Sequence, residues 1–118
     1  PTGDYFRSSP ALRRQFHLND VPADILESEA EQENLGVAAS LAAQAADRAA
    51  VREVVKAIDV PLFLGFGERD TSIDPAAEPT AYPKSPDITL YRLPGSAHCH
   101  NFASTRRQLW DRLLAWID

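Results

Sequence analysis

Two apolar runs in the second half of the chain predict β-strands. Residues 60–66 are continuously apolar, with proline near the start and Gly65 near the end, which is typical of a strand buried on both faces. Residues 88–93 alternate as a second strand does and are followed by Pro94 and Gly95. Prolines at positions 75, 79, 83 and 86 break the segment between them. This order predicts two parallel strands joined by a right-handed crossover.

Shorter helical patterns precede the strands. Residues 10–16 predict one or two helical turns, and a second helix is expected to begin near Asp20 or Val21, with Pro22 in its first turn. The Asn-Leu-Gly stretch at 34–36 is a typical helix stop, so this helix should end near Asn34. Its glutamates alternate, and alternate positions do not share a helical face, so they indicate a solvated acidic surface.

Two further helices are expected. Residues 37–58 are rich in alanine and carry apolar residues at helical spacing, which predicts the longest helix before the strands. A final helix should begin around Asn101, a suitable N-cap. Its apolar stripe comprises Phe102, Leu109, Trp110, Leu113, Trp116 and Ile117. Both tryptophans are expected to pack in the core.

Two parallel strands alone cannot form a buried sheet. Each face needs cover, and each open edge presents unpaired backbone groups. We therefore expect more sheet to come from elsewhere, either from an N-terminal part of the same protein or from a second copy of the chain.

Composition narrows the class of protein. The 118 residues are 44% hydrophobic and 25% charged, which is ordinary for one small soluble domain or part of one. No apolar run approaches the roughly 20 residues of a membrane span, so no membrane partner is expected. The net charge is -5, and the largest basic group is the pair Arg106 and Arg107. This distribution argues against nucleic acid as a partner.

Cysteine and methionine usage bear on compartment and origin. The single cysteine, Cys99, excludes an internal disulfide framework and fits a reducing compartment, so a cytoplasmic location is expected. The chain opens with Pro1 and contains no methionine. Processing or truncation is therefore expected to have produced this start.

The loops after the two strands carry the candidate chemistry. Functional residues of open parallel sheets gather where chains leave the carboxyl ends of the strands. Asp70 follows the first strand and His98 follows the second, so the two loops should lie side by side. The Asp70 carboxylate would then accept a hydrogen bond from one imidazole nitrogen, leaving the other free to take a proton from a nucleophile. This arrangement is two thirds of a catalytic triad.

These motifs resemble the α/β-hydrolase superfamily. Residues 60–70 (VPLFLGFGERD) are similar to its penultimate strand and acid turn, residues 93–98 (LPGSAH) to its last strand and histidine loop, and residues 114–117 to its final helix. The order of acid before histidine also agrees. The resemblance implies a partial α/β-hydrolase fold, with a helical cap or lid segment over residues 1–58 and the C-terminal part of the core over residues 59–118.

The resemblance further implies acyl hydrolysis of a small-molecule ester, without a cofactor, by a triad containing Asp70 and His98. The Gly-x-Ser-x-Gly nucleophile elbow is absent, because no serine stands centrally between two glycines. The nucleophile is expected outside these 118 residues, and the chain alone is expected to be inactive. Related enzymes with an aspartate nucleophile cleave carbon–halogen bonds or epoxides with a similar Asp and His, so the nucleophile stays open between Ser and Asp.

Several other residues are weaker candidates for the same chemistry. Asp74 is the reserve acid and His100 the reserve base, whereas His17 reads as a surface or packing residue. Ser96 lacks the sharp strand-to-helix turn of a nucleophile. His98, Cys99 and His100 do not show a recognised zinc spacing, so no metal is predicted, and Cys99 is expected to be a small buried thiol.

The chain also carries features of two functions other than hydrolysis, dinucleotide binding and association. Gly65 and Gly67 lack the third glycine of a dinucleotide-binding turn, since Asp70 stands in its place. The second hypothesis for function is a non-catalytic association module, which the missing nucleophile and the open sheet edge favour.

Overall fold

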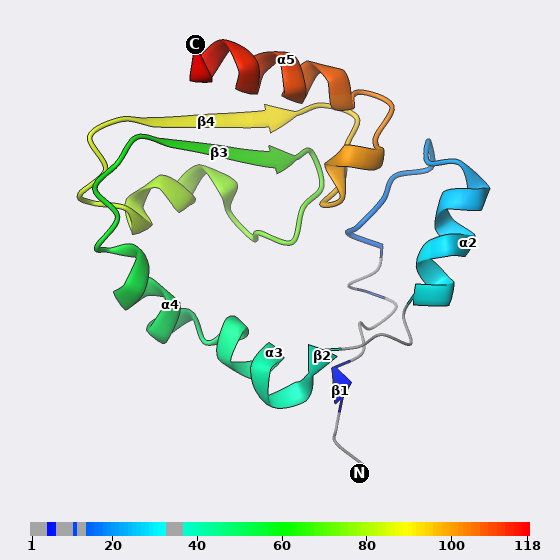
Figure 1. The fold of residues 1–118 in the computed structure, drawn as a ribbon, viewed down its shortest axis with the longest axis horizontal. Coiled ribbons are helices and arrows are strands. Elements are labelled where there is room, and N and C mark those ends of the chain that lie inside the picture. The colour runs from blue at the N-terminus through cyan, green and yellow to red at the C-terminus, as the bar shows by residue number, and fades with distance from the viewer. Residues whose placement is uncertain (1–4, 7–10, 12–13, 33–36) are drawn as a thin grey trace.

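The computed structural model describes residues 5–6, 11, 14–32 and 37–118. Its elements in chain order are β1 (Tyr5–Phe6), α2 (Ala23–Gln32), β2 (Val37–Ala38), α3 (Ala39–Ala46), α4 (Arg48–Val55), β3 (Leu62–Gly67), η2 (Pro75–Ala81), β4 (Ile88–Leu93), η3 (His100–Phe102) and α5 (Arg106–Ile117). The fold is mixed α/β, as predicted (Figure 1). Of the turns expected over residues 10–16, positions 14–16 form a turn, while positions 10, 12 and 13 and the stop at 34–36 lie outside the described residues.

The two predicted strands are present and parallel. β3 pairs with β4 from Leu62 opposite Ile88 to Gly67 opposite Leu93, so both strands end at the same edge. Helix α5 runs along this sheet, and η2 lies on the side away from α5 (Figure 1). The Phe63 and Trp116 rings meet edge to face with centroids 5.7 Å apart. This contact joins the final helix to β3.

The prediction of a single long helix over residues 37–58 is wrong. Positions 37–38 form β2, and the helix is divided into α3 and α4 of eight residues each, shorter than the ten-residue α2. The break lies at Asp47, whose backbone is extended (φ -72, ψ 93). Its carboxylate accepts hydrogen bonds from the amides of Ala49 (3.1 Å) and Ala50 (3.2 Å). An aspartate that caps a new helix competes with continuing the old one.

The final helix begins later than predicted. Asn101 belongs to the short η3 turn, and α5 starts at Arg106. Trp116 packs on the sheet as expected. Trp110 does not belong to the core, because it is 43% exposed and its indole N–H donates to the Asn101 side-chain oxygen at 3.2 Å.

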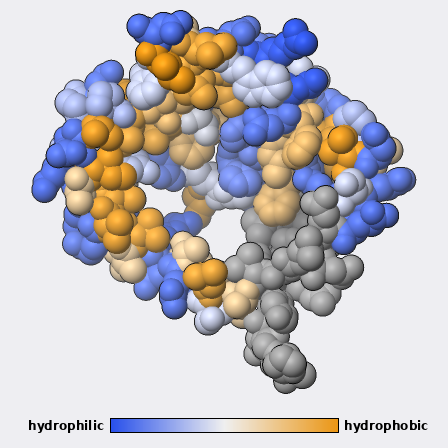
Figure 2. Space-filling model, in the orientation of Figure 1, coloured by the Kyte–Doolittle hydropathy of each residue, from blue (hydrophilic) through white to orange (hydrophobic). Residues whose placement is uncertain are grey.

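The core is small for the apolar content of the chain. The buried hydrophobic side chains in the described part are Val21, Leu93, Ala97, Ala103 and Leu109. The residues of β3 before Gly67 are half-buried, and only Gly67 is buried. The prediction that this strand is buried on both faces is therefore wrong for the described residues. Figure 2 shows apolar surface over α4 and α5, where Val54 is 72% and Ile117 is 65% exposed.

The second sheet does not extend the first. β1 and β2 form a separate antiparallel pair, with Tyr5 opposite Ala38 and Phe6 opposite Val37. Within the described residues the parallel sheet therefore has two strands, each with one free edge. No helix there is both long enough and apolar enough to cross a membrane.

Candidate active site

The parallel register brings the acid loop and the histidine loop together. The amide of Arg69 donates to the carbonyl oxygen of Ser96 at 3.1 Å, and the amide of Gly95 donates to the Glu68 carboxylate at 3.2 Å. Gly67 lies against the next part of the histidine loop, where a Cβ atom would stand 2.3 Å from the carbonyl oxygen of Ala97. Only glycine permits this approach.

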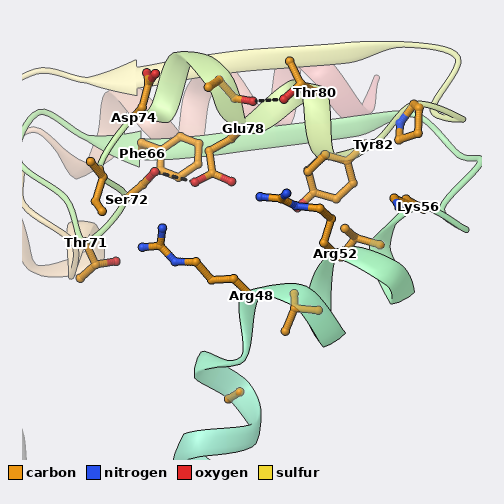
Figure 3. Close-up of a pocket in the computed structure, with 17 residues that line it drawn as sticks. Arg48, Arg52, Lys56, Phe66, Thr71, Ser72, Asp74, Glu78, Thr80 and Tyr82 are labelled. Atoms are coloured by element: carbon orange, nitrogen blue, oxygen red, sulfur yellow. Dashed lines mark hydrogen bonds between the residues drawn. The ribbon is translucent and has the colours of Figure 1, made fainter.

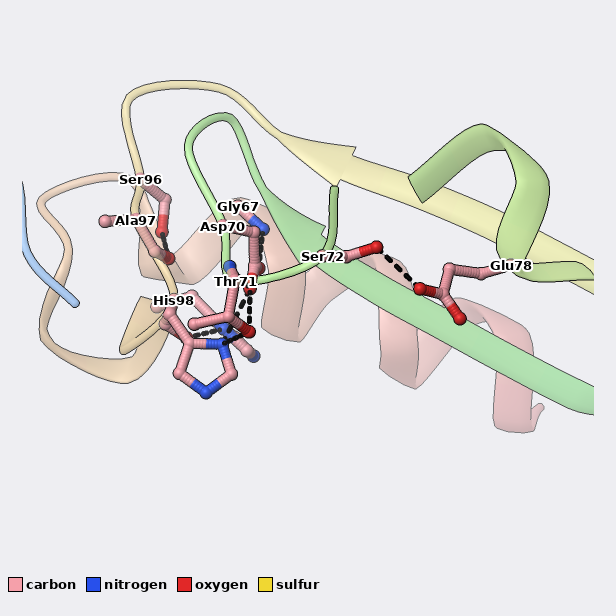
Figure 4. Close-up of polar contacts among 9 residues, drawn as sticks. Gly67, Asp70, Thr71, Ser72, Glu78, Ser96, Ala97 and His98 are labelled. Carbon is pink, nitrogen blue, oxygen red and sulfur yellow. Dashed lines mark hydrogen bonds and ion pairs between the residues drawn. The ribbon is translucent and has the colours of Figure 1, made fainter. Parts of the chain in front are cut away.

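Asp70 and His98 are in direct contact. Nδ1 of His98 lies 2.7 Å from Oδ1 of Asp70 (Figure 4). The Asp70 side chain is 3% exposed, and the His98 side chain is 47% exposed. An ionised carboxylate can only accept hydrogen bonds, so Nδ1 is the ring nitrogen that carries a proton and donates a hydrogen bond to Asp70. The spatial relationship predicted from the sequence is therefore confirmed, whereas the catalytic role stays a prediction.

The Asp70 carboxylate is held by several donors. The amide of Gly67 donates to Oδ2 at 2.8 Å, and the amide of Thr71 donates to Oδ1 at 2.6 Å. Burial raises the pKa of Asp70, but the hydrogen bonds from Gly67, His98 and Thr71 outweigh burial and hold this pKa below its ordinary value. The carboxylate is thus ionised at neutral pH and oriented toward the imidazole.

His98 is positioned through its backbone. Its amide donates to the carbonyl oxygen of Gln15 at 2.8 Å, and the next amide, from Cys99, donates to Phe16 at 2.8 Å. The centroid of the His98 ring lies 5.9 Å from the centroid of the Phe16 ring. Figure 4 shows the second ring nitrogen, Nε2, directed away from Asp70. In the part of the chain that the structure describes, Nε2 has no hydrogen-bond partner, so it is available to an incoming group.

The reserve residues are placed elsewhere. Asp74 is exposed, and its backbone carbonyl accepts from Ala77 at the start of η2. His100 turns its Nδ1 to the carbonyl oxygen of His98 at 2.7 Å. Burial lowers the pKa of His100, opposed by the charge of Asp70 and assisted by that of His98. Ser96 is fully buried, and its hydroxyl donates to Ala97 at 2.9 Å, so it does not present a nucleophile.

An open cavity of about 850 Å³ adjoins the acid loop. It lies between α4 and η2, and Thr71 and Ser72 line one side. Figure 3 shows Arg48 and Arg52 of α4 extending across it toward Glu78 and Tyr82. The Glu78 carboxylate is held by the Ser72 hydroxyl at 2.6 Å. The cavity offers room for a small molecule beside Thr71, and its lining does not include Asp70 or His98.

Sequence reasoning missed the residues that support Asp70 and a group of potential metal ligands. Gly67 and Thr71 support Asp70, and the glycine just before the acid turn was the available signal. His17, Glu29 and Cys99 form the group of potential metal ligands found among the described residues, with ligand atoms within 4.8 Å of one another. Distant segments contribute them, so no sequence spacing could have shown the group.

The Cys99 thiol itself is not activated as a nucleophile. Burial raises its pKa, and the negative charges of Glu29 and Asp70 raise it further. Cys99 is half-buried, as a small thiol beside the histidine loop.

A scan against protein-family models and searches of curated proteins and of solved structures found no match to this chain.

Proposed function

We propose that this chain supplies the acid, Asp70, and the base, His98, of the catalytic triad of a serine hydrolase of the α/β-hydrolase type. The observation that carries the proposal is the 2.7 Å contact between these side chains where two parallel strands end. Its substrate would be a small-molecule ester or a similar acyl compound. The cavity beside Thr71 provides space for part of such a substrate.

In this proposal the two residues work through one proton. Nε2 of His98 removes the proton of the nucleophile's hydroxyl as that oxygen attacks the acyl carbon, and later returns it to the leaving group. The ionised Asp70 fixes the ring through Nδ1 and stabilises the imidazolium formed during attack. Water then releases the acyl group, with His98 acting again as base.

The nucleophile in this proposal comes from outside the 118 residues. The free edges of β3 and β4 and the apolar surface over α4 and α5 support the addition of further sheet and helices. The partner would be the N-terminal part of the same hydrolase, or a second copy of the chain. An elbow placing a hydroxyl near Nε2 of His98 would complete the site.

A phosphonate probe that reacts with activated serines tests the proposal. The longer protein containing this chain should be labelled, and His98→Ala should abolish labelling. The matched variant His100→Ala should be labelled normally, because the His100 ring bonds to the backbone carbonyl of His98 and not to its imidazole. Normal labelling of His98→Ala would refute the assigned base. Absence of labelling with retained dehalogenase or epoxide hydrolase activity would assign the nucleophile to Asp instead.

The second candidate is a non-catalytic association module, favoured by the free strand edges. It predicts that the 118-residue chain self-associates. Light scattering would measure this directly, and a monodisperse monomer would contradict an assembly paired through the sheet edge.

A further inference from the structure

Three side chains from separate segments converge beside the histidine loop. His17 follows the turn at 14–16, Glu29 lies on α2, and Cys99 comes directly after His98. Their ligand atoms all lie within 4.8 Å of one another. Nε2 of His17 and Oε2 of Glu29 are 2.6 Å apart. A carboxylate, an imidazole and a thiol thus share one small volume.

This group is sheltered, and part of its hydrogen-bonding capacity is unused. The His17 side chain is 10% exposed, whereas Glu29 is 38% exposed. Nδ1 of His17 is buried and has no hydrogen-bond partner among the described residues. The imidazole ring is fixed edge to face on Phe102, with centroids 5.9 Å apart. Glu29 is therefore paired with a largely buried imidazole, whereas the sequence predicted a glutamate on a solvated acidic surface.

We propose that His17, Glu29 and Cys99 form a binding site for a divalent metal ion of the zinc class. Imidazole nitrogen and thiolate sulfur suit zinc, whereas magnesium and calcium prefer sets of oxygen ligands. Binding would release the thiol proton of Cys99, and the dication would be balanced by the thiolate and the Glu29 carboxylate. The fourth position of a tetrahedral ion would be open to water or another ligand.

The required movement is small. Zinc–ligand bonds of about 2.0 to 2.3 Å in tetrahedral geometry separate the ligand atoms by roughly 3.3 to 3.8 Å. The His17–Glu29 contact would open from 2.6 Å, and the wider separations in the group, of up to 4.8 Å, would close. Rotation of the Glu29 side chain accommodates such a shift because that side chain is partly exposed.

The ion would stabilise the position of the histidine loop. The amides of His98 and Cys99 already bond to Gln15 and Phe16, and the Arg69 guanidinium donates to the carbonyl oxygen of His17 at 2.8 Å. A metal bridging Cys99, His17 and Glu29 would add α2 to this assembly. Metal binding by these three side chains does not depend on the proposed hydrolase activity.

Titration with Co²⁺ tests the site, because a thiolate ligand to cobalt produces a near-ultraviolet charge-transfer band and tetrahedral coordination gives intense visible bands. The chain, and any longer protein containing it, should bind one equivalent at this site. Cys99→Ser should abolish the charge-transfer band, and His17→Ala and Glu29→Gln should each weaken binding by more than about tenfold. His100→Ala is the matched control and should bind normally.

Alkylation of the unmodified chain provides a second measurement that needs no variant. Cys99 is its only cysteine, so the mass shift reports one thiol. Zn²⁺ should slow alkylation at least about tenfold if it occupies the site. Three results would overturn the proposal: no saturable Co²⁺ binding, binding that survives Cys99→Ser, or equal loss in His100→Ala. The last would place the ion on His98, Cys99 and His100 instead.

Discussion

Gly67 approaches Ala97 so closely that a Cβ atom at position 67 would stand 2.3 Å from the Ala97 carbonyl oxygen and 2.7 Å from its carbonyl carbon. The obstacle is backbone on both counts, so it cannot rotate away as a side chain would. The same glycine donates its amide proton to Asp70 at 2.8 Å. One residue therefore sets both the separation of the two loops and the orientation of the acid.

Gly67→Ala should force the acid loop and the histidine loop apart. We expect the free energy of unfolding to fall by about 1–3 kcal/mol, the usual cost of overpacking. Denaturant unfolding measures this directly. Gly65→Ala is the matched control, because the three atoms nearest to its Cβ would all belong to side chains, the closest being Leu109 Cδ1 at 3.3 Å. Equal losses in the two variants would contradict the backbone argument.

Asp70→Asn should keep the shape of the acid and remove its charge. In the proposed hydrolase, turnover by the longer protein should fall by roughly 10⁴-fold, because an amide no longer enforces the reactive tautomer or stabilises the imidazolium. Steady-state kinetics on an activated ester would report the loss. Thr71→Val should have a much smaller effect, since its hydroxyl is 3.3 Å from Asp70 while its retained amide makes the 2.6 Å bond. A mild effect of Asp70→Asn would remove Asp70 from the proposed mechanism.

The lowered pKa of Asp70 predicts a pH dependence of stability. The folded chain holds this carboxylate ionised below its ordinary pKa of 3.8, so the stabilisation is complete above that value. It should be lost as pH falls from about 3.8 through the folded-state pKa, because the unfolded chain takes up the proton first. Urea unfolding across this acid range measures the effect, and Asp70→Asn should make the dependence shallower.

Glu53→Gln is the comparison for that experiment. A hydrogen bond from Lys56, together with the Lys56 charge, lowers the pKa of Glu53, but this pair is exposed to solvent and screened. It should change the pH dependence less than Asp70→Asn does. A larger effect at position 53 would show that the buried carboxylate is not the main contributor.

The Asp47 cap predicts a local effect on α4. Asp47→Ala should destabilise this helix by about 1 kcal/mol, because the amides of Ala49 and Ala50 lose their acceptor. Hydrogen exchange at those two amides should accelerate about fivefold for that loss. Asp47→Asn keeps an acceptor oxygen and should remain close to the original rates. Unchanged exchange in Asp47→Ala would mean that the cap does not hold the helix.

The strands show how far local pattern carries. β4 was predicted with its observed bounds, because its alternation is clear and Pro94-Gly95 ends it. β3 begins two residues later than the apolar run at Val60, since pairing with β4 rather than hydrophobicity decides where the ladder starts. The division of residues 37–58 was missed because alanine spacing looks helical throughout, and the capping side chain of Asp47 overrides it.

The candidate site also has one part that the local sequence predicted and another that depends on packing. Local order in the sequence placed Asp70 and His98 after neighbouring parallel strands, and backbone geometry alone then brings such loops to one edge. That inference needs no knowledge of distant segments. The support given by Gly67 depends on how closely the loops approach, and the convergence of His17, Glu29 and Cys99 depends on how α2 packs.

The sequence by itself determined the two strands, their parallel order and the pairing of one acid with one imidazole, because each follows from short-range pattern and the direction of the chain. Only the tertiary structure decided which tryptophan is covered, how closely the two loops approach and which distant side chains meet. Those outcomes depend on contacts between segments far apart in the chain, such as the carbonyl oxygen of Ala97 against Gly67. Distances of this kind are set by packing, which local periodicity does not encode.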